Sequence, residues 1–145
     1  MKTANPQLLG VLGGMGPMAT VDFLAKLIKA TPASCDQDHI PIIAHFVPQI
    51  PDRSDAIEGM GLSPQIALEN AALNIEREGA QALVIPCNTA HFWYEQIASR
   101  LSIPVLHIAD AVVEQIPLTL RKQPIGLLAT KATLQSAIYQ TRHPS

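Results

Sequence analysis

The feature that most restricts the fold is an alternation of short apolar runs with segments of helical periodicity. The apolar runs, each long enough for one buried strand, are 8–14, 41–47, 81–86, 104–108 and 124–130. The segments with apolar residues at helical spacing are 17–30, 64–78, 88–100, 110–120 and 131–140. Strands that alternate with helices form parallel sheets with right-handed crossovers. We therefore predict an α/β fold: a three-layer, flavodoxin-like parallel sheet with helices on both faces.

In such a fold, ligands bind beyond the carboxyl ends of the strands. Three loops have this position in the predicted order, namely 14–17, 48–53 and 87–91. The whole stretch 48–64 is rich in Pro, Gly and Asp, so we predict a loop that is long enough to have a function. We therefore expect the catalytic and ligand-binding residues to lie in these loops.

The composition excludes several classes of protein. Hydrophobic residues make up 48% of the chain and charged residues 15%, which is typical of a folded domain. A net charge of -2 without long charge runs gives no reason to expect nucleic acid or an anionic membrane as a partner. No apolar run approaches the roughly 18–20 residues of a membrane span. The first 14 residues do not have the pattern of a signal peptide, so we predict a cytoplasmic protein.

The stretch "ALVIPCNTAHFWYEQI" (82–97) places a cysteine where a predicted strand meets a predicted helix. Backbone N–H groups converge at such a junction, and the partial positive charge there favours a thiolate. Asn88 and Thr89 add short polar groups, and His91 lies one helical turn after Cys87, where it could accept or stabilise a proton. The alternative is that Cys87 is a small buried hydrophobic residue and that His91 only packs.

The remaining candidate positions have weaker signals. Cys35 lies in a polar loop far from any strand end, so we predict that it is not catalytic. Neither cysteine is part of a C-x-x-C or C-x-x-H pair, so we predict no metal site.

The glycine-rich turn at 13–20 does not match a phosphate loop, but its N–H groups can approach a small ligand. Arg53 can hold a carboxylate with its fork, or it pairs with a neighbouring aspartate.

Taken together, these segments resemble the aspartate/glutamate racemase family, and the aspartate racemase type in particular. The resembling motifs are "GVLGGMGPMAT" (10–20), "DQDHIP" (36–41), "IPDR" (50–53), "PCNTAH" (86–91) and "GLLATKATLQSAIY" (126–139). The resemblance implies two similar α/β domains with an active site between them. Residues 1–122 would form the first domain and 123–145 the start of the second. A weak internal echo of 10–20 at 126–136 agrees with that division.

The resemblance also implies a reaction and roles for residues. The family interconverts D- and L-amino acids without a cofactor: one cysteine thiolate removes the α-proton and a second returns one to the opposite face. By resemblance, Cys87 is the catalytic base of the first domain, and Asn88 and Thr89 bind the α-carboxylate or the amine. Arg53 holds the side-chain carboxylate of an acidic amino acid. Met15 lines the site, and Thr130 contributes from the second domain.

The chain departs from this pattern in one respect. The family's second cysteine motif would lie after Ser145, so these residues offer one thiol for a reaction that uses two. The activity of the chain alone is therefore in question, and self-association into a homo-oligomer is expected. Two alternatives remain at this point: a decarboxylase or isomerase of the same fold that needs one cysteine, and a non-catalytic domain that binds a carboxylate.

Overall fold

A computed structural model describes residues 7–143 and shows a parallel sheet of four strands. The strands are β1 (Leu9–Gly13), β2 (Ile42–Phe46), β3 (Ala82–Val84) and β4 (Val105–Leu106), in the order β2-β1-β3-β4. This is the order of the first strands of a flavodoxin-like sheet, so the predicted fold class is confirmed. The described residues do not include 1–6, which are part of the segment compared with signal peptides. They also do not include residues 1 and 145, the outer limits of the two predicted domains.

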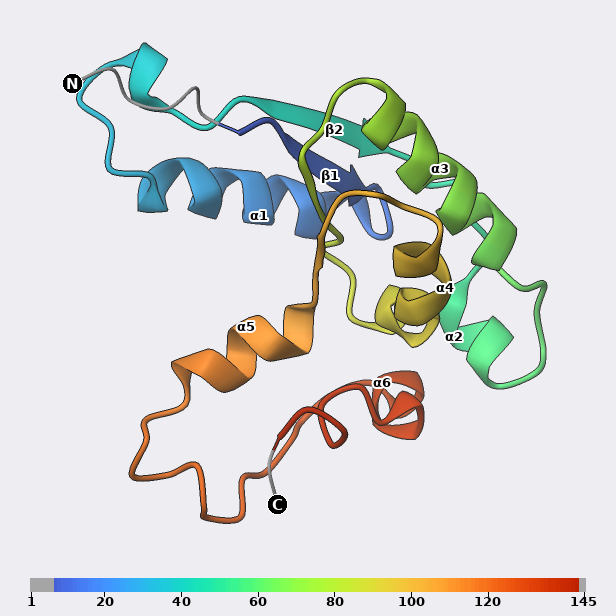
Figure 1. The fold of residues 1–145 in the computed structure, drawn as a ribbon. Helices are drawn as coiled ribbons and strands as arrows, with labels where there is room; N and C mark the ends of the chain where they lie inside the picture. Colours follow the sequence, from blue (N-terminus) through green and yellow to red (C-terminus); the bar gives the residue numbers. More distant parts are fainter. Residues whose placement is uncertain (1–6, 144–145) are drawn as a thin grey trace.

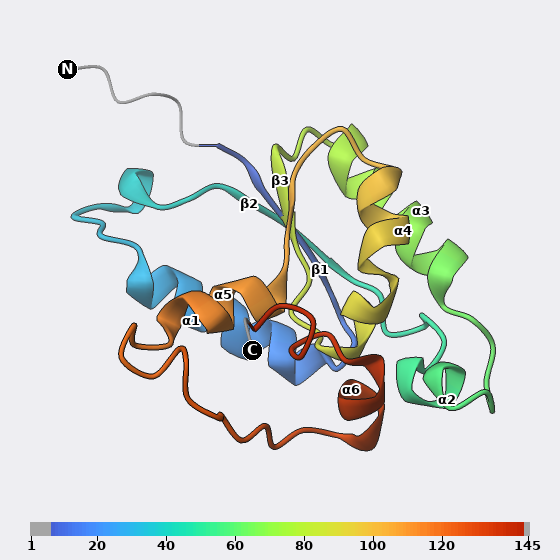
Figure 2. The ribbon, with the colours of Figure 1, turned by 60° about the horizontal axis from the view of Figure 1, so that its bottom comes forward.

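Helices cover both faces of the sheet (Figures 1 and 2). Helices α1 (Pro17–Ala30) and α5 (Ile108–Gln115) lie side by side on one face. Helices α3 (Gln65–Arg77) and α4 (Tyr94–Ser99) lie on the other. Helix α1 has the predicted limits, because Pro17 suits a first turn and apolar residues follow at helical spacing.

The two faces differ in how tightly they are packed. The main cluster of fully buried side chains joins the sheet to α3 and α4, and includes Leu12, Leu68, Ile75, Leu83 and Ile97. The other face has a cavity of about 720 Å³ between α1 and α5, lined almost entirely by apolar side chains such as Phe23 and Leu106. The stability of the sheet therefore comes mainly from its α3–α4 side.

The predicted loop at 48–64 contains a short helix, α2 (Arg53–Ile57), which is a correction to the sequence analysis. Asp52 is the reason, because its carboxylate accepts hydrogen bonds from the N–H groups of Ser54 and Asp55. The bond from Asp55 is also the main cause that lowers the pKa of the Asp52 carboxyl group. The signal was in the sequence, as an aspartate directly before the first helical residue.

The predicted helix at 88–100 is divided into two parts. Residues Thr89–Trp93 form a 3₁₀ helix, η2, and the α-helix α4 begins only at Tyr94. In a 3₁₀ turn the side chains at i and i+3 lie above one another, and Ala90 and Trp93 are both buried. Tertiary burial thus overrides the α-helical periodicity at the start of this segment.

The predicted strand at 124–130 is wrong, since these residues form no ladder with any described strand. Leu128 is fully exposed, although it lies in the middle of the apolar run. An isolated strand gains no ladder hydrogen bonds, and its nearest candidate neighbour, β4, is only two residues long. The echo of 10–20 therefore extends only to the helix that follows, α6 (Lys131–Ser136), which ends before the predicted limit at 140.

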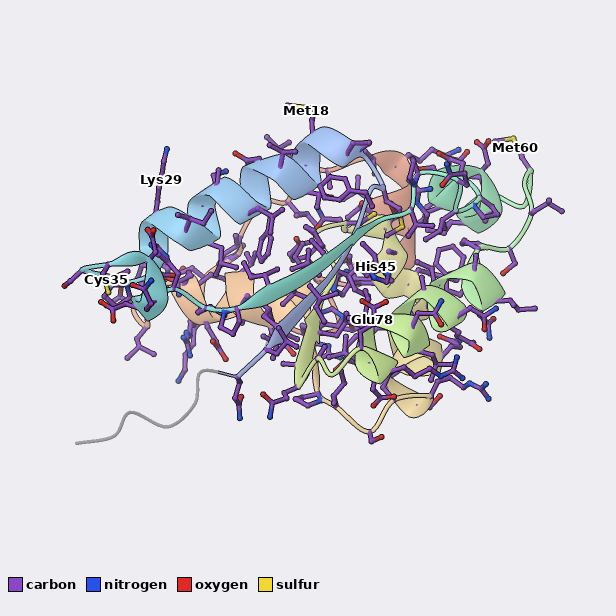
Figure 3. All side chains as sticks on the ribbon, turned by 90° about the horizontal axis from the view of Figure 1, so that it is seen from above. Met18, Lys29, Cys35, His45, Met60 and Glu78 are labelled. Atoms are coloured by element: carbon purple, nitrogen blue, oxygen red, sulfur yellow. The ribbon has the colours of Figure 1, made fainter. Side chains whose placement is uncertain are left out.

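Polar contacts join the α3 end of the molecule to the sheet and to the next turn. The ring of His45, on β2, lies 3.0 Å from a carboxylate oxygen of Glu78 just after α3, and Figure 3 shows the two side chains directed toward one another. The Glu76 carboxylate accepts hydrogen bonds from Ser102 N at 2.7 Å and Ile103 N at 3.2 Å. Glu76 therefore supplies a partner for two backbone donors in the turn that leads into β4.

We expect Glu76→Ala to lower the free energy of unfolding by about 1–3 kcal/mol, because it removes a charged acceptor from two backbone N–H groups. Glu76→Gln is the matched control, since both bonds go to one carboxylate oxygen and an amide oxygen in its place can still accept them. Urea denaturation followed by circular dichroism measures both values. No loss in Glu76→Ala would contradict this role, and equal losses in the two variants would show that a neutral amide cannot replace the carboxylate.

The remaining short element is η1 (Asp36–Asp38), a 3₁₀ turn before β2. Within residues 7–143, no helix is both long enough and apolar enough to cross a membrane.

Candidate active site

A cavity of about 430 Å³ lies at the carboxyl edge of the sheet, where the sequence predicted ligand binding. Its volume is within the range usual for small-molecule sites. The residues that line it come from the β1–α1 turn, from α2, from the loop after β3 and from residues 127–139. They are Met15, Ala19, Ser54, Pro86, Cys87, Asn88, Thr89, Leu127, Leu128, Ala129, Thr130, Thr133 and Tyr139. Unlike the larger cavity between α1 and α5, this one combines a thiol with several hydroxyl and amide groups.

The turn after β1 forms one wall of the cavity. Gly14 has φ +86, a conformation that favours glycine, and its N–H donates to the hydroxyl oxygen of Thr20 at 2.9 Å. The N–H of Val47 donates to the carbonyl of Gly13 at 3.0 Å, which holds the ends of β1 and β2 together. The chain therefore turns sharply after β1, and Met15 lines the cavity.

The loop after β3 places three predicted residues in the cavity: Cys87, Asn88 and Thr89. The N–H of Cys87 donates to the carbonyl of Ile85 at 2.8 Å, which makes a tight turn directly after the strand. The sulfur of Cys87 lies 3.5 Å from the hydroxyl oxygen of Thr89. Since η2 is a short 3₁₀ helix, the immediate polar neighbour of the thiol is this hydroxyl and not the end of a long α-helix.

His91 is not placed to exchange a proton with a ligand. Its ring is 3% exposed, Nδ1 lies 2.8 Å from the carbonyl oxygen of Cys87, and Nε2 accepts from the N–H of Ile108 at 3.2 Å. These partners define the neutral form with the proton on Nδ1, and burial lowers the pKa of the ring. The structure therefore corrects the predicted proton-transfer role: His91 connects the Cys87 loop to the start of α5.

Arg53 is close to the cavity but does not line it. Its Nη1 donates to the carbonyl oxygens of Ile50 at 3.1 Å and Pro51 at 3.0 Å. Its Nε is buried, and among the described residues it has no hydrogen-bond partner. The sequence alternative, a pair with Asp52 or Asp55, is not observed in residues 7–143. The backbone carbonyls of Ile50 and Pro51 therefore hold the guanidinium group beside the cavity.

The segment after α5 contributes residues between 127 and 139 to the lining of the cavity. Thr130, a predicted site residue, caps α6 by accepting from Thr133 N at 3.3 Å. Polar contacts join the segment to the body, among them Lys131–Glu58 at 2.7 Å, Tyr139–Asn88 at 2.5 Å and Arg142–Asp110 at 2.6 Å. It therefore forms part of the site and is not a free tail.

Sequence reasoning missed Ser54 and Tyr139. Tyr139 ends the motif "GLLATKATLQSAIY" (126–139), but a tyrosine near the end of a predicted helix gives no chemical signal by itself. Its contact with Asn88 joins positions 51 residues apart, which no local pattern predicts. Ser54 was hidden because its short helix was not predicted.

The second cysteine is distant from the site. Cys35 is exposed and precedes β2, so it lies at the amino edge of the sheet. Figure 3 shows it at one end of the molecule, with Met60, which follows α2, at the other. Within the described part of the chain, no group of three or more His, Cys, Asp or Glu residues is arranged to hold a metal ion.

Next to the site, His107 caps the start of α5. The hydrogen bond that makes this cap forms only while the imidazole ring of His107 is neutral. Nδ1 of His107 accepts from the N–H of Ala109 at 3.1 Å, so this nitrogen must be unprotonated. Burial is the main cause that lowers the pKa of His107 to about 4, with smaller effects from His91 and Arg142. Asp110 acts in the opposite direction.

Because the pKa of His107 is lower in the folded chain than in the unfolded chain, its contribution to stability is complete above pH 6.5. It is lost as the pH falls from 6.5 toward 4. We expect a decrease of up to about 3 kcal/mol in the free energy of unfolding over this range. His107→Asn should reduce the slope, since an amide oxygen can cap a helix without titrating. Urea denaturation at several pH values tests this, and equal slopes in both proteins would contradict it.

A flavodoxin-like sheet with a thiol and several polar groups at its carboxyl edge defines the class: an α/β protein with a small-molecule site. Comparisons with known proteins then give the family. The family model described as Asp/Glu/Hydantoin racemase matches residues 12–144. The chain belongs to this racemase family, as the resemblance in its motifs indicated.

Individual relatives agree with this assignment. The chain is 37% identical over 139 residues to the broad specificity amino-acid racemase RacX of Bacillus subtilis, covering 92% of this chain and 59% of the relative. Among solved structures, it is similar to aspartate racemase of Picrophilus torridus, with a TM-score of 0.81, 34% identity and coverage of 94% and 58%. An aspartate racemase homologue from Pyrococcus horikoshii gives a TM-score of 0.67, 25% identity and coverage of 94% and 60%. The chain thus spans about 59% of the length of the curated relative.

Proposed function

We propose that this chain carries one half of a cofactor-independent amino-acid racemase, in which the Cys87 thiolate removes the α-proton of an acidic amino acid. The observation that supports this most directly is the position of Cys87 in the cavity at the carboxyl edge, together with Asn88, Thr89 and Thr130. The names of its relatives, an amino-acid racemase and an aspartate racemase, support the same class of reaction.

The proposed roles follow from the donors present around the thiol. Asn88 and Thr89 bind the α-carboxylate or the amine, next to the sulfur. The Thr89 hydroxyl, 3.5 Å from the sulfur, can donate a hydrogen bond to a thiolate and so stabilise it. The guanidinium group of Arg53, next to the cavity-lining Ser54, is the cation that we assign to the side-chain carboxylate, which favours an acidic substrate.

The proton transfer has a stereochemical limit. The thiolate takes the α-proton and becomes a thiol, and the electron pair of the C–H bond stays on the substrate as a planar carbanion. Return of a proton from the same sulfur restores the original configuration. Inversion needs a second acid on the opposite face, and Cys35 is at the other edge of the sheet.

We also propose that 1–122 and 123–145 are the first domain and the start of a second. The segment 124–130 supports this division, because it forms no ladder with the described strands and its residues 127–130 line the cavity. The predicted self-association of the chain stays a prediction, which analytical ultracentrifugation tests.

The experiment that tests the proposed function is proton NMR of the chain with L-aspartate, and then with L-glutamate, in D₂O. We expect loss of the α-proton signal as deuterium replaces it, with retention of the L configuration by polarimetry. Formation of the D-enantiomer would mean that the chain, or an oligomer of it, supplies a second acid on the opposite face. No exchange with either amino acid, in a sample shown to be folded by circular dichroism, would contradict the proposal for this chain.

A further inference from the structure

Tyr139 reaches the candidate site from the segment that follows α6. Ala137 ends α6 with φ 54, so the chain reverses there. Ile138 is 5% exposed and anchors the reversed segment in the body of the molecule. Tyr139 follows directly, lines the cavity and donates its hydroxyl hydrogen to Oδ1 of Asn88 at 2.5 Å. The position of Tyr139 is thus set by the backbone around it and by a buried neighbour.

Asn88 has little else to define its orientation. Its side chain is exposed to the cavity, and the bond from Tyr139 is the only hydrogen bond to its amide group among residues 7–143. A side-chain amide that rotates by 180° about its last bond exchanges an acceptor for two donors. Packing does not prevent this rotation, because the shapes of the two ends are almost the same. The contact with Tyr139 is therefore what decides which end faces the cavity.

We propose that Tyr139 is a positioning residue that fixes the amide of Asn88, with Oδ1 held by the phenol and the two N–H donors left for a ligand in the cavity. This inference rests on the proposed function only for the identity of the ligand. It gives the segment after α5 a specific role, since the donors of the Cys87 loop are oriented only when this segment is in place. Burial raises the pKa of the phenol, so it remains a donor at neutral pH.

The first test needs no substrate. In the ¹⁵N-labelled chain, the side-chain amide of Asn88 should give a resolved pair of signals with restricted motion in ¹⁵N relaxation. Tyr139→Phe removes only the hydroxyl oxygen, and we expect the pair to shift and its order parameter to fall. Tyr94→Phe is the matched control, because the Tyr94 hydroxyl donates to the carbonyl of Val105 at 3.0 Å, outside the cavity. It should leave the Asn88 signals unchanged.

The second test is a double-mutant cycle for binding of L-aspartate, measured by isothermal titration calorimetry. Loss of one hydrogen bond in an accessible cavity should raise Kd about 3- to 10-fold in Tyr139→Phe. In the Asn88→Ala background, the same change should raise Kd less than about 2-fold, since there is no amide left to orient. A residue that bound the substrate itself, or that only stabilised the fold, would weaken binding equally in both backgrounds.

The outcomes separate this inference from the proposed function. Unchanged Asn88 signals in Tyr139→Phe, or additive losses in the cycle, would overturn the positioning role of Tyr139. If the wild-type chain binds no L-aspartate, the choice of ligand fails, and the NMR experiment alone decides on Tyr139. A shift with increased motion in that experiment supports the role whatever the ligand is.

Discussion

Replacement of Cys87 by serine should lower the rate of α-proton exchange from L-aspartate by about 10²- to 10⁴-fold, the usual contribution of a positioned general base. A thiol ionises far more readily than an alcohol and, as the thiolate, can accept a proton from carbon, so serine supplies no comparable base. Serine keeps the shape of the side chain and its contact with Thr89. The loss is therefore chemical, and the free energy of unfolding should change by less than about 1 kcal/mol.

Cys35→Ser is the matched control, because it makes the same substitution at an exposed position on the opposite edge of the sheet. We expect it to retain the wild-type exchange rate. Both rates come from proton NMR in D₂O with equal concentrations of folded chain. Exchange that survives in Cys87→Ser, or that falls equally in Cys35→Ser, would mean that Cys87 is not the base.

Much of the fold follows from local patterns. The limits of α1 were predicted because Pro17 and the apolar periodicity act within one segment. The predicted strand at 124–130 is wrong for the opposite reason. A strand forms only when a neighbouring strand supplies its hydrogen-bond partners, and an apolar run contains no information about that neighbour. Similarly, the division of 88–100 depends on the burial of Trp93 by other elements.

The candidate site divides in the same way. Cys87, Asn88 and Thr89 were predicted together because they follow one strand, and the edge of a parallel sheet collects such residues. Two other conclusions needed coordinates. The role of His91 depends on which atoms its two ring nitrogens meet, and the N–H of Ile108 is 17 positions away. The contact of Tyr139 depends on the reversal at Ala137, where a residue other than glycine has a positive φ.

The largest expected loss of stability is that of Gly14→Ala, at about 3–5 kcal/mol. Gly14 has φ +86, where an alanine costs about 1–2 kcal/mol by itself. A Cβ atom there would lie 2.3 Å from the backbone nitrogen of Val47, and this nitrogen holds β2 to β1 through its bond to Gly13. Backbone cannot move aside as the end of a flexible side chain can, so the strand ends must separate.

Gly16→Ala, two residues along the same turn, is the control that isolates this cause. Gly16 has φ -74, and a Cβ atom built on it meets nothing within 4 Å, so its replacement should cost less than about 1 kcal/mol. Thermal and urea denaturation compare the two variants. Because the same turn presents Met15 to the cavity, Gly14→Ala should also weaken binding of L-aspartate under conditions where the variant is still folded. Equal stabilities for the two variants would contradict the close approach of β2 to this turn and, with it, the shape of this wall of the site.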